Sequence, residues 1–178
     1  MTLHEDIAFD FIVPQDGWQP MLDIASGQVN KGNKSTLIVD NMSKLTALPP
    51  PSRPVELMQR YRFEIAGAPA FHTVSALGCP FTCHFCESGI ESVRRFSTAM
   101  IDRDLSVMAG THDQIGNAQK SVMFFDDVGL MNPKQVAQLA ELVCGHGFDT
   151  WRAFTHAYLV RKFRGDLLEP FVTTGGRR

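Results

Sequence analysis

The sequence has little that would mark a membrane protein or a nucleic-acid-binding protein. It contains no run of eighteen apolar residues, which a membrane-spanning helix needs, and no charged-then-apolar segment near its start. Its formal net charge is -2, and the absence of a basic run leaves no electrostatic footprint for nucleic acid. We therefore expect a cytoplasmic protein without a membrane or nucleic-acid partner.

Cysteine is also scarce, and its placement argues against a disulfide scaffold. Four cysteines among 178 residues, three of them crowded together, are not the pattern of a small secreted domain. With 44% hydrophobic and 20% charged residues, the composition suits a globular protein with one sizeable core. Cys144 lies apart on the apolar face of a predicted helix, and we expect it to be a small buried hydrophobic residue.

The three crowded cysteines form a C-x3-C-x2-C pattern in the segment 79–86, which we call the cysteine loop. Cys79, Cys83 and Cys86 can supply three thiolates to one metal centre. A four-iron cluster is usually held by four cysteines, so three leave one iron open to another ligand. A zinc site completed by His84 is the alternative. Its geometry is unfavourable, because His84 directly follows Cys83 and zinc sites usually draw their second ligand pair from a separate segment.

Strands and helices are predicted to alternate around and after the cysteine loop. The order is typical of βαβ units with a parallel sheet, and it places the loop at the C-terminal end of a strand, where such folds carry their functional residues. The predicted elements are a strand over 71–77, a helix from the N-cap Ser97 to Gly110, a strand over 122–125, a helix from Asn132 to Gly145 with Val136, Leu139, Ala140 and Val143 buried, a strand over 150–154, and a helix near 166–171 weakened by Pro170.

The cysteine loop, Cys79-Pro80-Phe81-Thr82-Cys83-His84-Phe85-Cys86, resembles the C-x3-C-x-aromatic-C signature of the radical S-adenosylmethionine (SAM) superfamily. The resemblance implies that Cys79, Cys83 and Cys86 hold three irons of a 4Fe-4S cluster and that SAM binds the fourth. It implies reductive cleavage of SAM to methionine and a 5'-deoxyadenosyl radical, with flavodoxin or ferredoxin as electron donor. The radical would abstract hydrogen from a substrate that the sequence does not identify, or serve a related methyl transfer. The alternative is a non-catalytic cysteine-rich module that binds zinc or an iron-sulfur cluster, or an inactive remnant.

The resemblance also implies roles for residues near the cluster. Phe85 would lie beside the adenine of SAM. Asp126 and Asp127 follow the strand 122–125, at the position where the family binds the amino group of SAM; a pair of solvated turn residues is the alternative. Arg152 is either a partner of the SAM carboxylate or a surface charge. Leu77 departs from the arginine that many relatives carry before the Gly-Cys pair.

The predicted fold is α/β: a partial (β/α) barrel of the radical SAM type, N-terminal half only, preceded by a small α+β extension. The resemblance covers residues 71–178, and we expect the chain to be a fragment. Residues 49–70 are predicted to be a proline-rich linker. Residues 1–48, with strands predicted at 7–13 and 35–39, are similar in layout to the end of the cobalamin-binding domain of one branch of the family, or are a structural extension. Because the Asp-x-His-x-x-Gly motif is absent, we do not predict cobalamin binding.

Overall fold

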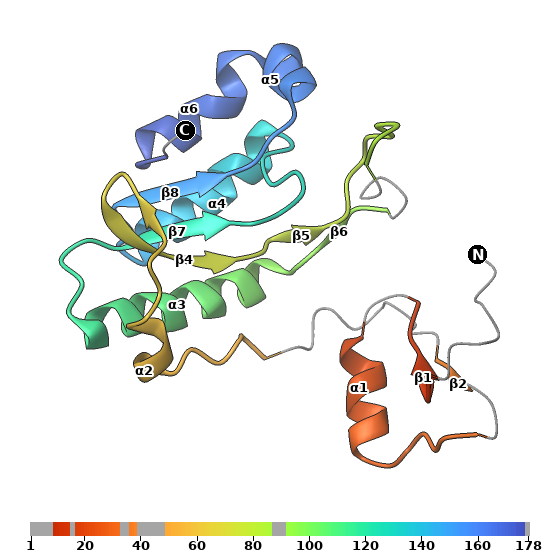
Figure 1. The fold of residues 1–178 in the computed structure, drawn as a ribbon. Helices are drawn as coiled ribbons and strands as arrows, with labels where there is room; N and C mark the ends of the chain where they lie inside the picture. Colours follow the sequence, from red (N-terminus) through yellow and green to blue (C-terminus); the bar gives the residue numbers. More distant parts are fainter. Residues whose placement is uncertain (1–8, 15–16, 33–35, 39–48, 87–91, 177–178) are drawn as a thin grey trace. The chain divides into compact units, whose positions relative to one another are not determined.

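The structure is a computed structural model, and it describes residues 9–14, 17–32, 36–38, 49–86 and 92–176 (Figure 1). The chain divides into two compact units, residues 1–47 and residues 48–178, and each is described by itself. Within the described ranges, every helix is too short or too polar to cross a membrane.

The described residues of the first unit form a strand-helix-strand motif. Strands β1 (Phe11–Ile12) and β2 (Thr36–Leu37) are parallel, and helix α1 (Trp18–Ala25) connects them. Both strands lie within the predicted segments 7–13 and 35–39. A parallel pair requires a crossover connection, which α1 supplies.

The second unit alternates strands and helices in the predicted order. Helices α3 and α4 each connect two neighbouring strands of one parallel set. The elements of this unit are α2 (Val55–Met58), β3 (Glu64–Ile65), β4 (Ala68–Thr73), β5 (Ala76–Leu77), β6 (Arg94–Arg95), α3 (Thr98–Ile115), β7 (Ser121–Phe124), α4 (Pro133–Gly145), β8 (Thr150–Ala153), α5 (Ala157–Phe163) and α6 (Gly165–Thr173).

The main sheet of this unit has the strand order β3-β4-β7-β8. Strands β4, β7 and β8 are parallel, with Phe71 opposite Val122 and Val122 opposite Trp151, whereas β3 is antiparallel to β4. Strand β3 also contacts β7 and β8, with which it does not pair, so the sheet is curled (Figure 1). The unit is therefore of the mixed α/β class with a curled, half-barrel sheet, which confirms the predicted fold class at this level.

The two faces of the main sheet are covered differently. Side chains alternate between faces along a strand, so Val122 and Phe124 of β7 point to one face and Met123 points to the other. The first face packs against α3, α4 and α6 in the main hydrophobic core. Met123 packs instead with Ile65 and Ala70 in a small separate cluster. We call the face that carries Met123 the inner face of the sheet.

Helix α3 begins as predicted and ends later than predicted. The Ser97 hydroxyl accepts a hydrogen bond from the Met100 N–H at 3.3 Å, which confirms the predicted N-cap. The predicted end at Gly110 is wrong, since the helix continues to Ile115. Gly116 caps its C-terminal end, with a φ of +81°, the left-handed conformation that glycine adopts without strain.

Helix α4 confirms its predicted cap and its buried stripe but not the placement of Cys144. The Asn132 side chain accepts a hydrogen bond from the Gln135 N–H at 3.0 Å. The four predicted core residues of this helix are buried. Cys144, however, is exposed. It follows the buried Val143 and is turned by about 100° around the helix axis, away from the core.

The chain after β8 forms two helices where the sequence predicted one. Helix α5 was missed, and α6 includes Pro170. Phe171 of α6 packs edge-on against the buried Trp151, with ring centroids 4.6 Å apart. The Trp151 indole N–H donates to the Thr174 hydroxyl at 3.1 Å, and its backbone N–H donates to the Gly175 carbonyl at 3.2 Å. Residues 174–176 are thereby held against β8.

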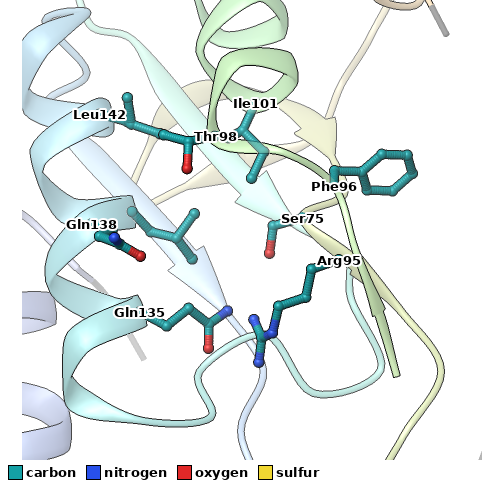
Figure 2. A pocket seen from close by; sticks show the side chains of 9 residues that line it. Ser75, Arg95, Phe96, Thr98, Ile101, Gln135, Gln138 and Leu142 are labelled. Atoms are coloured by element: carbon teal, nitrogen blue, oxygen red, sulfur yellow. The ribbon is translucent and has the colours of Figure 1, made fainter. Parts of the chain in front are cut away.

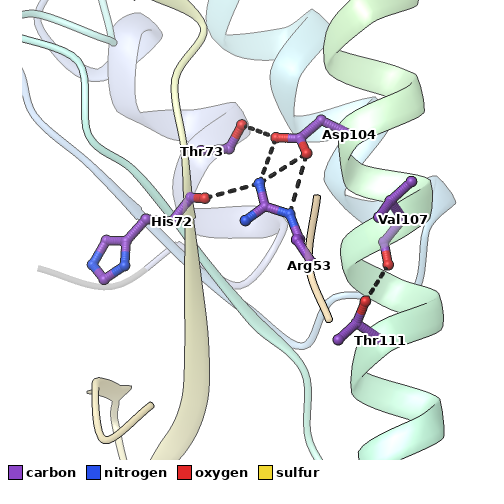
Figure 3. A network of polar contacts seen from close by, with 6 residues as sticks. All are labelled: Arg53, His72, Thr73, Asp104, Val107 and Thr111. Carbon is purple, nitrogen blue, oxygen red and sulfur yellow. Dashed lines mark hydrogen bonds and ion pairs between the residues drawn. The ribbon is translucent and has the colours of Figure 1, made fainter. Parts of the chain in front are cut away.

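Residues 49–70, predicted as a linker, contribute α2, β3 and the first residues of β4 to the second unit. Arg53 is central to their attachment (Figure 3). Its guanidinium binds both carboxylate oxygens of Asp104 on α3, at 2.8 and 2.9 Å, and donates to the His72 carbonyl at 3.1 Å. The Thr73 hydroxyl donates to the same carboxylate at 2.5 Å. The side chains of Arg53 and Asp104 are each 9% exposed, so this ion pair lies inside the protein.

Candidate functional site

The candidate site lies at the edge of the main sheet where the three parallel strands end. The chain leaves β4 toward β5 and the cysteine loop, Asp126 and Asp127 follow β7, and Phe154 follows β8. The carboxyl ends of parallel strands meet at one edge, which is where α/β folds carry ligand and catalytic groups. The alternation read from the sequence therefore brings the predicted site segments to one side of the sheet.

The cysteine loop is carried on a two-stranded stem. Strands β5 and β6 are antiparallel, with Ala76 opposite Arg95 and Leu77 opposite Arg94. The Phe96 N–H also donates to the Ser75 carbonyl at 3.1 Å, which lengthens the pairing by one step. Both ends of the chain segment that contains the three cysteines are thus held together at its base. We call β5 and β6 together the stem.

The first half of the cysteine loop is docked on the body of the unit. Cys79 and Phe81 are partly buried and pack against the main core. The Phe81 ring stacks on His156, with centroids 4.0 Å apart and planes 21° from parallel, and meets Tyr158 edge-on at 6.2 Å. His156 is the N-cap of α5, which follows β8. The loop therefore reaches from β4 across to the end of β8.

The three cysteines share this loop but are not gathered into a ligand group. Cys79 and Cys83 are partly buried and Cys86 is exposed, and all are free thiols. The Cys86 N–H donates to the Cys83 carbonyl at 3.1 Å, a tight turn that places these two residues one turn apart. Among the residues that the structure describes, no three His, Cys, Asp or Glu side chains lie close enough to hold a metal ion. Three thiols are suitable donors for a metal centre. Metal binding would require the three side chains to turn toward one point.

The three residues predicted to bind SAM occupy different environments. Phe85 is 93% exposed, and Asp127 also lies at the surface. Asp126, the neighbour of Asp127, is buried at 3% exposure. Phe85 is thus open to a ligand, whereas the Asp126 side chain is already engaged by the protein.

The Asp126 carboxylate binds the turn between β4 and β5. It accepts hydrogen bonds from the Ser75 N–H at 2.6 Å, the Ser75 hydroxyl at 2.5 Å and the Ala76 N–H at 3.2 Å. Burial raises the pKa of Asp126, and the hydrogen bonds from Ser75 and Ala76 and the charge of Arg95 oppose that rise. The predicted strand over 71–77 is broken at this turn into the end of β4 and β5, and the carboxylate accepts the N–H groups that a neighbouring strand would otherwise accept.

Aromatic side chains on the inner face of the sheet were not singled out from the sequence. Phe125 and Phe154, which follow β7 and β8, are 60% and 45% exposed and meet edge-on at 5.7 Å. Phe125 also meets His72 of β4 at 5.6 Å. The strand register sets Arg152 beside Met123, and hence on this face. The run 122–125 is apolar throughout, so only the alternation of side chains between the faces of a strand, applied to this run, could have placed Phe125 opposite the core.

A pocket of about 120 Å³ lies between the base of the stem and helices α3 and α4, on the helix-covered side of the sheet (Figure 2). The Arg95 and Gln135 side chains point toward one another across it, and the Ser75 hydroxyl faces it. Burial lowers the pKa of Arg95, and the Asp126 carboxylate partly offsets this effect. The pocket is lined by residues of α3 and α4, so it is separate from the inner face.

Comparison with known proteins gives one distant relationship. No family model matches the chain, and no solved structure matches it. The chain is 27% identical over 107 residues to an uncharacterized methyltransferase of Pyrococcus horikoshii. The match covers 60% of this chain and 22% of that protein, so the chain spans less than a quarter of the relative's length.

Proposed function

We propose that this chain is the cluster-bearing part of a radical SAM enzyme. In this proposal Cys79, Cys83 and Cys86 hold a 4Fe-4S cluster whose remaining iron binds SAM. When bound and reduced, such a cluster supplies the electron that cleaves SAM to methionine and a 5'-deoxyadenosyl radical. The observation that carries the proposal is a C-x3-C-x-Phe-C loop on a stem at the carboxyl edge of a parallel sheet.

The protein's own residues have three tasks in this proposal. The stem and the Phe81–His156 stack hold the cysteine loop over the sheet edge. Phe85 offers an exposed ring to the adenine. The aromatic side chains of the inner face shield the reacting groups from water. Proteins that carry cofactors exclude competing reactions in this way. An electron donor such as flavodoxin or ferredoxin reduces the cluster.

The reaction we propose is methyl transfer that would use two SAM molecules and two electrons from the donor. One SAM would be cleaved to methionine and the 5'-deoxyadenosyl radical, which takes a hydrogen atom from the substrate. The second SAM would give its methyl group to the substrate and leave as S-adenosylhomocysteine. The support for methyl transfer is the name of the Pyrococcus horikoshii relative, a methyltransferase. Hydrogen abstraction without methyl transfer is the second outcome open to the same cofactors. Product analysis separates the two, because methyl transfer marks the product with the methyl group of labelled SAM.

Anaerobic incubation of the full chain with ferrous iron and sulfide tests the cluster. We expect the chain to take up about four irons and to develop the broad visible absorption of thiolate-bound iron. The variant with Cys79→Ala, Cys83→Ala and Cys86→Ala should lose both. Cys144→Ala is the matched control, because Cys144 is an exposed free thiol outside the loop.

Two results would contradict the proposal. One is equal iron uptake by the triple variant, which would place the iron elsewhere. The other is uptake of zinc, dependent on the three cysteines, by a chain that forms no iron chromophore. That second result would favour the cysteine-rich module instead.

A further inference from the structure

Asp126 occupies the point where the chain leaves the main sheet for the cysteine loop. Strand β4 pairs with β7 through Thr73 and Phe124, and the Phe125 N–H adds one more bond to the Thr73 carbonyl at 2.8 Å. Beyond that point the two strands separate. Asp126 then accepts the N–H groups of Ser75 and Ala76, at 2.6 and 3.2 Å. Backbone pairing between β4 and the chain after β7 has ended at this point, and the Asp126 side chain accepts the next N–H groups in its place.

The contacts of Asp126 use both of its oxygens. One oxygen accepts the two N–H groups, and the other accepts the Ser75 hydroxyl at 2.5 Å. Gly129 lies next to the second oxygen, because a Cβ atom there would lie 3.0 Å from it. Asp126, Ser75 and Ala76 are 3%, 2% and 1% exposed. The carboxylate is therefore enclosed by protein groups that it already binds.

The residues that Asp126 holds belong to the base of the stem. Ala76 pairs with Arg95, and the Ser75 carbonyl accepts the Phe96 N–H. Cys79 lies three residues after Ala76 and packs partly buried against the main core. Loss of the Asp126 contacts would leave two N–H groups buried without an acceptor, and the structure can satisfy them only by opening the turn toward water.

We infer that Asp126 is a positioning residue, which fixes the base of the stem and so sets the location of Cys79 rather than binding the amino group of SAM. The statement that the positioned loop holds a cluster rests on the proposed function. The positioning itself does not, and it can be measured in the metal-free chain.

The first experiment measures how fast each cysteine of the metal-free full chain is alkylated, with the sites resolved by mass spectrometry. Asp126→Ala should raise the rate at Cys79 about ten-fold or more, as expected when buried donors lose their acceptor. The rate at the exposed Cys144 should stay constant, which shows that the reagent acts equally on both chains, and unchanged fluorescence of the buried Trp151 shows that the fold is intact. Asp113→Ala, which alters a surface aspartate paired with Lys120, is the matched control and should leave Cys79 at its original rate.

Two further variants keep the test decisive if Asp126→Ala does not fold. Gly129→Ala pushes a methyl group against the carboxylate and should also raise the Cys79 rate while the acid is retained. Asp126→Asn keeps an oxygen that can accept the Ser75 and Ala76 N–H groups, so its Cys79 rate should stay within about two-fold of the original chain. Unchanged Cys79 rates in both Asp126→Ala and Gly129→Ala would overturn the inference.

The second experiment titrates SAM into the reconstituted chain and its Asp126→Asn variant. A positioning residue predicts that the variant, which lacks the charge but keeps the acceptor, binds SAM within about two-fold of the original chain. A loss of SAM binding with Cys79 still protected would overturn the inference and restore Asp126 as a ligand. If the original chain takes up no cluster, the proposed function fails, and the alkylation rates still decide the positioning role.

Discussion

The Arg53–Asp104 ion pair predicts a large loss of stability when either partner is removed. Arg53→Ala would leave the Asp104 carboxylate, whose side chain is 9% exposed, with the Thr73 hydroxyl as its remaining partner among those that the structure gives. Breaking a buried pair in this way costs about 3–5 kcal/mol of unfolding free energy, because the other charge stays buried. Asp104→Ala should cost a similar amount, since it strands the Arg53 guanidinium.

Urea unfolding followed by tryptophan fluorescence measures this loss. The chain has two tryptophans, and Trp18→Phe leaves the buried Trp151 as the reporter of the second unit. The double variant Arg53→Met with Asp104→Leu should be more stable than either single variant, because apolar side chains of similar volume tolerate burial. Losses below about 1 kcal/mol in both single variants, the range of surface pairs, would refute the reasoning.

Two other stability predictions concern the second unit. His112 is fully buried, and burial lowers its pKa below the value of 6.5 in the unfolded chain. Below pH 6.5 the unfolded chain therefore binds a proton at His112 more readily than the folded chain does. The free energy of unfolding should therefore fall as pH drops below 6.5, the pKa of His112 in the unfolded chain, by up to about 1.4 kcal/mol per pH unit. Urea titrations at several pH values measure this slope, which His112→Gln should flatten. Gly175→Ala should destabilise the unit by more than about 1–2 kcal/mol, since φ is +83° and the added Cβ would lie 2.4 Å from the Asp149 carbonyl oxygen. Gly147→Ala, with φ of +72° and open space around it, is its control in thermal unfolding, and equal losses in the two variants would contradict the steric argument.

The repeating part of the fold was predictable because its signals are local. The caps at Ser97 and Asn132 are where the structure has them, and the strand predicted from the apolar run at 122–125 lies one residue earlier, at Ser121–Phe124. The sequence misplaces the end of α3 because Gly110 resembles a stop signal, whereas a glycine inside a helix costs only about 1 kcal/mol and tertiary packing offsets it. Helix α5 was missed because its apolar periodicity is short.

The location of the candidate site was predictable, but its internal contacts were not. The C-x3-C-x2-C spacing and the strand before it place the cysteine loop at the sheet edge. The turn at Ser75, where the predicted strand breaks, donates a hydrogen bond to Asp126, fifty-one residues away, and no local pattern reports a contact over such a separation. For the same reason the sequence could not show that Asp126 is buried while Asp127 is exposed.

The most direct test of the proposed function is the electron paramagnetic resonance spectrum of the reduced, reconstituted chain with and without SAM. A cluster held by Cys79, Cys83 and Cys86 with one open iron predicts a signal that changes when SAM is added. A signal that stays the same at saturating SAM, or a chain that forms no such cluster, would contradict the proposal that this loop binds SAM through iron.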